Sequence, residues 1–149
     1  MFRIENVSVE KLVGQELYTE IVEIWELSVR ATHDFLSEED IQHYKKLIKE
    51  QYLDAVDLYI VRKEGQILGF MGIADDNIEM LFIDPDFRGR GIGRLFVRYA
   101  LVELGVNKVD VNEQNEQALA FYQKMGFTIK ERSSLDGEGK PYPILHLQQ

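Results

Sequence analysis

Apolar residues recur at helical spacing in the first third of the chain. Those between Leu17 and Val29 fall on one face of a predicted helix, with Trp25 as the largest of them. Ser37 predicts the N-cap of a second helix that runs to about Tyr52, because acidic residues follow in its first turn, where they favour the helix dipole. Before these helices, the alternation of apolar and polar residues over Phe2–Glu5 predicts a short first strand.

The middle of the chain changes to the period of β-strands. Two apolar runs within residues 58–74 flank a turn at residues 63–66, which predicts a β-hairpin. A further apolar strand follows at Ile78–Ile83 and is interrupted only by Glu79. The Asp84–Pro85 dipeptide ends that strand, because proline cannot donate a hydrogen bond to the ladder.

The second half of the chain alternates helices with strands. A helix is predicted from Ile92 to about Gly105, with its inward face formed by Ile92, Leu95, Phe96, Tyr99 and Val102. A strand at residues 108–112 precedes a second helix, which Asn115 caps and Gly126 closes. Strands at residues 127–130 and 144–147 end the chain. The order βααβββαβαββ predicts a mixed α/β fold with a helical crossover between its central strands.

Composition narrows the class of protein. With 149 residues and 45% hydrophobic positions, the chain predicts a single domain over residues 1–149. No run approaches the ~18 apolar residues of a membrane span, and the first residues lack a signal-peptide core. The absence of cysteine excludes disulfides, thiolate nucleophiles and cysteine-based zinc sites. The net charge of −9 argues against a general nucleic-acid binder. We therefore expect a cytoplasmic protein with no membrane or nucleic-acid partner.

The segment R-G-R-G-I-G, Arg88–Gly93, lies between a strand and a helix. Its glycines let the backbone approach a ligand closely, and the free N–H groups of the helix N-terminus attract phosphate or pyrophosphate. Arg90, Arg94 and Arg98 follow at steps of four and share a helix face. The alternative is a glycine turn before a solvated basic face. The P-loop pattern is absent, and the third glycine comes one residue too early for a Rossmann fingerprint.

The segment resembles the GCN5-related N-acetyltransferase (GNAT) family, whose signature is R/Q-x-x-G-x-G/A after a strand that ends near a proline. Arg88–Gly93 matches this signature at every position. A second family signature, an asparagine followed by a tyrosine and a glycine–aromatic pair, is matched by Asn115, Tyr122, Gly126 and Phe127. The segments A-T-H-D-F-L, N-E-Q-N-E-Q and G-K-P-Y-P resemble the YjaB-type branch of bacterial members. The resemblance implies a GNAT-like fold, with a mixed sheet of six to seven strands and four helices.

The resemblance also implies acetyl-CoA as the cofactor. Backbone groups of a splayed strand would hold the thioester carbonyl and the pantetheine arm, and the glycine loop would cradle the pyrophosphate. The cofactor-binding residues implied in this way are Leu81, Phe82, Ile83, Arg88, Gly89, Arg90, Gly91, Ile92, Gly93, Arg94, Asn115 and Tyr122.

Acetyl transfer to an amine needs an acid for the departing thiolate and a base for the amine proton. By resemblance Tyr122 is the general acid; the alternative is a core aromatic beside Phe121. Glu79 on the cofactor strand and Asp110 on its neighbour are candidate bases, acting directly or through water, and water alone is a further alternative. Each carboxylate is equally explained as an ordinary residue at a strand edge.

The acceptor groove of the resembling fold is flanked by the connector between the first two helices and by the loop before the last strand. His33, Asp34 and Phe35 lie on the first segment and Tyr142 on the second, and all four are candidate substrate-binding residues. No other His or Cys has the spacing of a metal ligand, so we expect no metal. His43 and His146 are interpreted as surface or strand residues.

Together these residues predict an acetyl-CoA-dependent N-acetyltransferase that acts by direct attack of a primary amine. The acceptor remains open between a small molecule and a protein lysine or N-terminus, and a homodimer is left open. The alternative function is a non-catalytic acyl-CoA-binding module, which would not need Tyr122 as an acid. A dinucleotide oxidoreductase is disfavoured, because the ribose-binding acid is missing at its expected offset.

Overall fold

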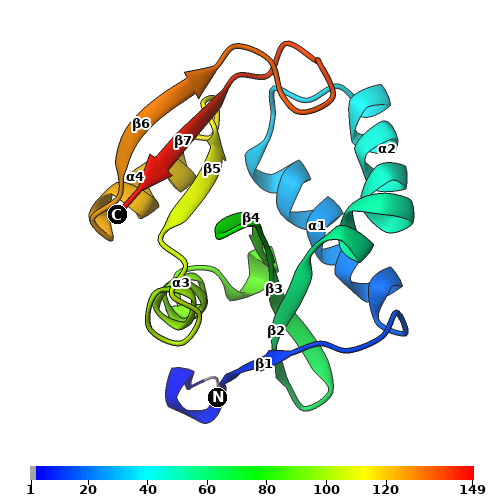
Figure 1. Ribbon diagram of the computed structural model, residues 1–149. Helices are drawn as coiled ribbons and strands as arrows, with labels where there is room; N and C mark the ends of the chain where they lie inside the picture. The colour runs from blue at the N-terminus through cyan, green and yellow to red at the C-terminus, as the bar shows by residue number, and fades with distance from the viewer. Residues whose placement is uncertain (1–2) are drawn as a thin grey trace.

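The computed structural model describes residues 3–149. In this part of the chain a seven-stranded mixed sheet, of order β1-β2-β3-β4-β5-β7-β6, carries helices on both faces (Figure 1). The strands are β1 (Val9–Lys11), β2 (Asp57–Lys63), β3 (Gln66–Ala74), β4 (Asn77–Ile83), β5 (Lys108–Asn112), β6 (Thr128–Ser133) and β7 (Ile144–Gln148). The predicted element order and the mixed α/β fold are confirmed.

Four α-helices accompany the strands of the described chain: α1 (Tyr18–Thr32), α2 (Glu38–Leu47), α3 (Ile92–Val102) and α4 (Glu116–Lys124). Two of the predicted caps are present. The Asp40 N–H donates to Ser37 Oγ over 3.1 Å at the start of α2, and the Ala118 N–H donates to Asn115 Oδ1 over 3.2 Å at the start of α4. Both bonds satisfy N–H groups that have no partner within the helix.

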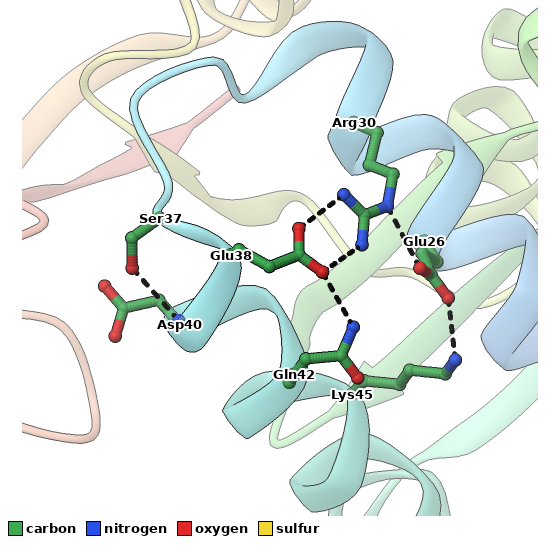
Figure 2. Close-up of polar contacts among 7 residues, drawn as sticks. All are labelled: Glu26, Arg30, Ser37, Glu38, Asp40, Gln42 and Lys45. Atoms are coloured by element: carbon green, nitrogen blue, oxygen red, sulfur yellow. Dashed lines mark hydrogen bonds and ion pairs between the residues drawn. The ribbon is translucent and has the colours of Figure 1, made fainter.

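A network of charged side chains joins α1 to α2 (Figure 2). The Arg30 guanidinium donates to both carboxylate oxygens of Glu38 over 2.7 Å and to Glu26 over 3.0 Å, while Lys45 pairs with Glu26 over 2.8 Å. The Arg30 hydrogen bonds lower the pKa of Glu38 to about 2. Single exposed pairs contribute little, but a geometry that includes a bidentate arginine fixes how α2 lies on α1.

The two faces of the sheet have separate cores. Helices α1 and α2 cover one face, where Trp25, Ile60 and Phe70 are buried. Helices α3 and α4 pack on the other, where Phe96 and Phe127 are fully enclosed. The alternation of side chains along each strand sends residues to one core or the other.

The centre of the sheet is open. Strands β4 and β5 are parallel and pair at Asn77–Lys108 and Ile78–Val109, after which they diverge (Figure 1). Beyond Ile78, β4 continues along β3, whereas β5 continues along β7. One edge of β4 is therefore left without a neighbouring strand in the described chain, and its backbone groups face the opening.

The structure corrects the predicted first strand. Ile4–Asn6 forms a 3₁₀ turn, the strand lies at Val9–Lys11, and Phe2 falls outside the described residues. An edge strand of three residues is defined by its partner rather than by its own pattern: Val9 pairs with Val61 in β2.

Two helices also differ in detail from the prediction. Helix α2 ends at Leu47 and continues as a π-helical turn at Ile48–Tyr52, which shifts the face that these residues present. In α3 the buried face consists of Ile92, Phe96, Val97 and Ala100. Val102 is 74% exposed, so its predicted inward position is wrong. The core-facing stripe is centred on the row that runs through Phe96 and Ala100.

Candidate active site

Two cavities meet at the gap between β4 and β5. The larger, of about 840 Å³, lies under α1, α2 and the β6–β7 loop, and the smaller, of about 400 Å³, lies between the end of α1 and the start of α3. His33, Leu81, Phe82, Asn115 and Ala118 line both. A ligand that reached from one cavity into the other would pass these residues.

The predicted glycine loop forms the floor of the smaller cavity. Gly91 is the N-cap of α3 and has a φ of 88°, a left-handed conformation that favours glycine. The first N–H groups of α3 therefore open toward the cavity with the positive end of the helix dipole behind them. A Cβ atom at Gly93 would lie 3.4 Å from the Phe121 ring, so the absence of a side chain keeps this approach open.

The arginines of the loop have different surroundings. Arg88 is half-buried and donates to Ser28 Oγ over 3.0 Å, which ties the loop to α1, and burial lowers its pKa. Arg94 lines the smaller cavity at the mouth of the α3 N-terminus. Arg90 is exposed, stands over the Phe87 ring at 5.4 Å and does not line either cavity of the described structure.

The diverging part of β4 joins the two cavities. Leu81 and Phe82 line both of them, and Ile83 lines the smaller one. Their side chains pack into opposite cores, Leu81 and Ile83 toward α3 and Phe82 toward α1. The side chains of these residues can therefore pack in the two cores while their main-chain groups stay exposed at the open edge. The prediction that main-chain groups of this strand hold the cofactor needs both.

Tyr122 reaches the larger cavity from α4. It is 5% exposed, and its ring packs edge-on against Phe121 and Phe127 at centroid distances of 5.0 Å and 5.5 Å. Burial raises the pKa of Tyr122 above its ordinary value, so the hydroxyl stays protonated at neutral pH. Asn115 lies at the start of the same helix, where it caps α4, and it lines both cavities.

The two predicted carboxylates come from the strands that border the gap, Glu79 from β4 and Asp110 from β5. Glu79 and Asp110 both line the larger cavity. Partial desolvation raises the pKa of Glu79, and the nearby carboxylates of Asp110 and Asp75 raise it further, against a hydrogen bond from Asn77 that lowers it. Asp110 has a direct partner, because the imidazole Nδ1 of His146 lies 2.7 Å from its Oδ1.

His33 lies at the junction of the two cavities. The Thr32 hydroxyl donates to the Ser28 carbonyl over 2.8 Å, so it accepts from the His33 Nδ1–H, also at 2.8 Å. Burial, and then the Arg88 cation, lower the pKa of His33 to about 4, although Asp34 acts in the opposite direction. The ring is therefore neutral at physiological pH.

The other predicted acceptor residues lie on the β6–β7 loop and on the connector between α1 and α2. Tyr142 lines the larger cavity and its hydroxyl donates to Asp40 in α2. Phe35 stands between the rings of His33 and Tyr142, at 5.2 Å and 5.9 Å, and supports both from outside the cavity lining. Asp34 is exposed and, in the described structure, lies outside the lining of either cavity.

Sequence reasoning did not assign how this loop is held. Tyr44 donates a hydrogen bond to Asp136, and Tyr52 donates one to Glu138. These two hydroxyls, from α2 and from the π-helical turn, hold the β6–β7 loop in place. Lys140 adds an ion pair with Asp40 at 3.1 Å. In Figure 1 the loop before β7 reaches over toward α2. Asp136, Gly137 and Glu138 of this loop line the larger cavity.

Sequence reasoning interpreted His146 as a surface or strand residue and assigned no role to Ser133. The Nε2 atom of His146 lies 2.7 Å from Ser133 Oγ, and both residues line the larger cavity. The alternation in I-L-H-L-Q, with His146 between two buried leucines, is the local signal that this ring turns away from the α3–α4 core. Its partners become evident only from the strand register.

Residues 3–149 contain no group of three or more His, Asp or Glu side chains arranged to hold a metal ion. Within the same range no helix has the length and apolar character needed to cross a membrane. Neither finding assigns a role.

A family model described as "Acetyltransferase (GNAT) domain" matches residues 54–129. The chain is also 46% identical over 129 residues to the peptidyl-lysine N-acetyltransferase YjaB of Escherichia coli, covering 86% of this chain and 87% of that protein. The chain belongs to the GNAT family.

The solved structures agree with this assignment. The solution structure of apo-form YjaB from Escherichia coli superposes with a TM-score of 0.86 at 42% identity, covering 95% of this chain and 96% of that one. The PaiA N-acetyltransferase of Thermoplasma acidophilum, solved in complex with coenzyme A, shares the fold with a TM-score of 0.73 at 20% identity, over 96% and 99% of the two chains. The predicted GNAT fold and the resemblance to YjaB are both confirmed.

Membership of the GNAT family makes the chain an enzyme that transfers an acetyl group from acetyl-CoA to an amine. This favours the predicted acetyltransferase over the non-catalytic module. The residues around the gap fit the cofactor: an anion-binding helix terminus and glycine loop at one end, and a free strand edge at the other. The smaller cavity is lined by this loop and by Leu81, Phe82 and Ile83, and it shares Leu81 and Phe82 with the larger one.

Proposed function

We propose that this GNAT enzyme acetylates lysine side chains of proteins. The observation that carries the proposal is the lining of the larger cavity, which combines tyrosine rings with carboxylates: Tyr44, Tyr52 and Tyr142 line it together with Asp75, Glu79 and Asp110. A lysine side chain combines an aliphatic stem with a cationic head, and aromatic walls and carboxylates suit the two parts respectively. The YjaB relatives of two bacteria are named peptidyl-lysine N-acetyltransferases, which agrees with this choice.

In this proposal acetyl-CoA lies across the gap in the sheet. The free edge of β4 at Leu81, Phe82 and Ile83 holds the thioester carbonyl and pantetheine through main-chain groups, and Asn115 contacts the arm from α4. The pyrophosphate lies on the N–H groups of Gly91, Ile92 and Gly93. Arg94 meets it from the side, whereas Arg88 and Gly89 shape the loop, and Arg90 borders it from the surface.

The chemistry follows from the two cavities. The amine nitrogen attacks the thioester carbonyl directly, the C–S bond breaks, and the Tyr122 hydroxyl protonates the departing thiolate. Because burial raises the pKa of Tyr122, its proton is retained until sulfur charge develops. Glu79 and Asp110 lie on the acceptor side, where the proton of the amine must leave.

The acceptor enters between the His33 connector and the loop that carries Tyr142. His33 and Tyr142 form the wall, Phe35 supports both rings, and exposed Asp34 attracts cationic acceptors at the rim. The overall charge of −9 acts in the same direction. The same composition, without cysteine, supports a cytoplasmic, single-domain protein that binds neither membrane nor nucleic acid, and a homodimer is to be tested by light scattering.

The test is a thiol-release assay with acetyl-CoA across matched acceptors. We would compare a lysine peptide, the same peptide with its lysine dimethylated and a free N-terminus, a polyamine and an amino-sugar antibiotic. Turnover of the lysine peptide, with the acetyl group located on the lysine by mass spectrometry, is expected. Turnover confined to the N-terminus or the small amines would show that the acceptor is not a lysine side chain. Acetyl-CoA binding without any turnover would support the non-catalytic acyl-CoA-binding module.

A further inference from the structure

Three polar side chains form a continuous chain on the acceptor face of the sheet. Asp110 Oδ1 lies 2.7 Å from His146 Nδ1, and His146 Nε2 lies 2.7 Å from Ser133 Oγ. The residues come from three adjacent strands, because Asp110 and His146 are directly opposite in the β5–β7 ladder and β6 pairs with the other edge of β7. Antiparallel pairing therefore places Asp110 directly beside His146, and Ser133, which pairs with Ile144, lies diagonal to His146 on the same face; we call these three side chains the row.

The row points into the acceptor cavity rather than the core. Leu145 and Leu147, the neighbours of His146 in β7, are buried against α3 and α4, as are Val109 and Val111 on either side of Asp110. Alternation along the strands therefore directs His146 and Asp110 to the opposite face. There Asp110, Ser133 and His146 line the larger cavity together with Glu79 and Tyr122.

The partners define where the proton of the imidazole lies. The Asp110 carboxylate can only accept, so the hydrogen bond at 2.7 Å requires a proton on Nδ1. The lone pair of Nε2 then faces the Ser133 hydroxyl, which donates to it. A neutral imidazole oriented by a carboxylate on one side and by a hydroxyl on the other is arranged to take up a proton through that hydroxyl.

Other charged groups face this row. Glu79 from β4 is close enough to His146 for their charges to interact, and Glu131 stands opposite His146 in the β6–β7 register. Both side chains carry a carboxylate, as does Asp110, so the ring that would accept the proton lies among acidic groups.

We propose that Ser133, His146 and Asp110 form the proton relay that accepts the proton from the acceptor amine. This inference rests on the function proposed above and names the base left open there. As the nitrogen forms its bond to the acetyl carbon and the C–S bond breaks, the nitrogen gives its extra proton to Ser133 Oγ, whose own proton passes to His146 Nε2. The products are the amide, coenzyme A protonated at sulfur by Tyr122, the Tyr122 phenolate and the His146 imidazolium. The imidazolium then returns its proton to solvent and the phenolate takes one from solvent, which restores the enzyme. Asp110 is a positioning residue that holds the ring and its charge.

Asp110 alone is less suited to this role. Its carboxylate is already occupied by the His146 Nδ1–H, and a carboxylate is a weaker base than a neutral imidazole. Glu79 has no such ordered path and is the rival that the experiment must separate. A second rival uses the same three residues differently, with Ser133 as a nucleophile that carries the acetyl group itself.

The experiment compares His146→Ala, Ser133→Ala, Ser133→Thr and Glu79→Gln with a matched control, Gln148→Ala. Gln148 lies two residues beyond His146 on the same face of β7 and outside the lining of the larger cavity. Each variant is assayed with acetyl-CoA and two peptides that differ at one side chain, lysine or an aminooxy analogue whose amino group is already neutral at the assay pH. Calorimetry of acetyl-CoA binding shows that the cofactor site is intact.

For the lysine peptide we expect kcat to fall by roughly 10²-fold or more in His146→Ala and in Ser133→Ala, with cofactor affinity unchanged. The loss should be several-fold smaller for the aminooxy peptide, because its less basic nitrogen releases the extra proton to water more readily. Added imidazole should restore part of the His146→Ala rate, and Ser133→Thr should stay close to the unmodified enzyme. Gln148→Ala should match the unmodified enzyme with both peptides. If His146→Ala does not fold, the two serine variants carry the test.

Several results would overturn the relay. Equal losses with both peptides would show that His146 only supports the strand, and a large lysine-specific loss in Glu79→Gln alone would make Glu79 the base. An acetyl group trapped on Ser133 would show the nucleophilic route. Full activity of all three His146 and Ser133 variants would reject the relay while the acetyltransferase stands, whereas an unmodified protein that acetylates no amine would reject the proposed function with it.

Discussion

Replacing Tyr122 by Phe is expected to remove the acid for the leaving group while leaving the fold in place. The ring is 5% exposed and packs edge-on against Phe121 and Phe127, contacts that phenylalanine preserves. The hydroxyl lies in a desolvated position, and this burial raises the pKa of Tyr122. Losing it should change the free energy of unfolding by only about 1 kcal/mol.

The catalytic effect should be much larger. General acid catalysis typically contributes 10²–10⁴-fold, which is roughly 3–5 kcal/mol of activation free energy. The hydroxyl acts on charge that appears at sulfur in the transition state, so kcat should fall by that factor with little change in acetyl-CoA affinity. The loss should shrink with an acyl donor whose thiol has a lower pKa, because that thiolate departs without a proton.

Steady-state kinetics with both donors, calorimetry and urea unfolding measure these quantities on one preparation. Tyr99→Phe is the matched control, since Tyr99 lies on α3 against Tyr59 and outside the lining of both cavities. An unchanged kcat for Tyr122→Phe would show that Tyr122 is only a core aromatic residue and that solvent protonates the thiolate. An equal loss with both donors would show that the variant disturbs the acceptor rather than the leaving group.

Gly93→Val should weaken acetyl-CoA binding by more than tenfold in calorimetry, because even a Cβ atom would lie 3.4 Å from Phe121 at the mouth of α3; unchanged affinity in a folded variant would place the pyrophosphate elsewhere. Tyr142→Ala should raise the acceptor KM and leave cofactor affinity intact, since it removes the hydroxyl that donates to Asp40; unaltered acceptor kinetics would misplace the groove. The lowered pKa of His33, about 4 in the folded protein, means that the folded state resists a proton that the unfolded chain accepts near 6.5. The neutral His33 therefore does not reduce the free energy of unfolding above about pH 6.5. As the pH falls toward 4, protonation of the unfolded chain lowers the free energy of unfolding by up to about 3 kcal/mol. Urea unfolding between pH 7.5 and 4.5 should therefore show a steeper acid loss for the unmodified protein than for His33→Gln, and parallel losses would contradict the assignment.

Local patterns predicted the elements whose causes are local. Ser37 and Asn115 cap their helices because each has a hydroxyl or amide oxygen within reach of an N–H three residues ahead. The β2–β3 hairpin follows from two apolar runs around a turn, and the glycine loop follows from closely spaced glycines, of which Gly91 adopts the left-handed conformation at the start of α3. These features need no knowledge of the rest of the chain.

The missed features depend on contacts between distant residues. The true first strand is set by its pairing with β2, about fifty residues later, rather than by its own alternation. His146 looks like an ordinary strand residue until the register places it opposite Asp110, 36 positions earlier. In the same way, Tyr44 and Tyr52 could be predicted to face inward, but their bonds to the β6–β7 loop could not.

A single irregularity in β4 links the cofactor side of the site to its acceptor side. In the β3–β4 ladder Gly72 pairs with Met80 and Ile73 pairs with Ile78, so Glu79 is an extra residue, a β-bulge. The bulge resets the alternation, because Ile78, Leu81 and Ile83 all pack toward α3 whereas Met80 and Phe82 pack toward α1. It also lies where β4 separates from β5, immediately after the Ile78–Val109 pair. The residue inserted by the bulge therefore lines the larger cavity at the place where the strand edge becomes free, which is where the proposed mechanism puts the thioester.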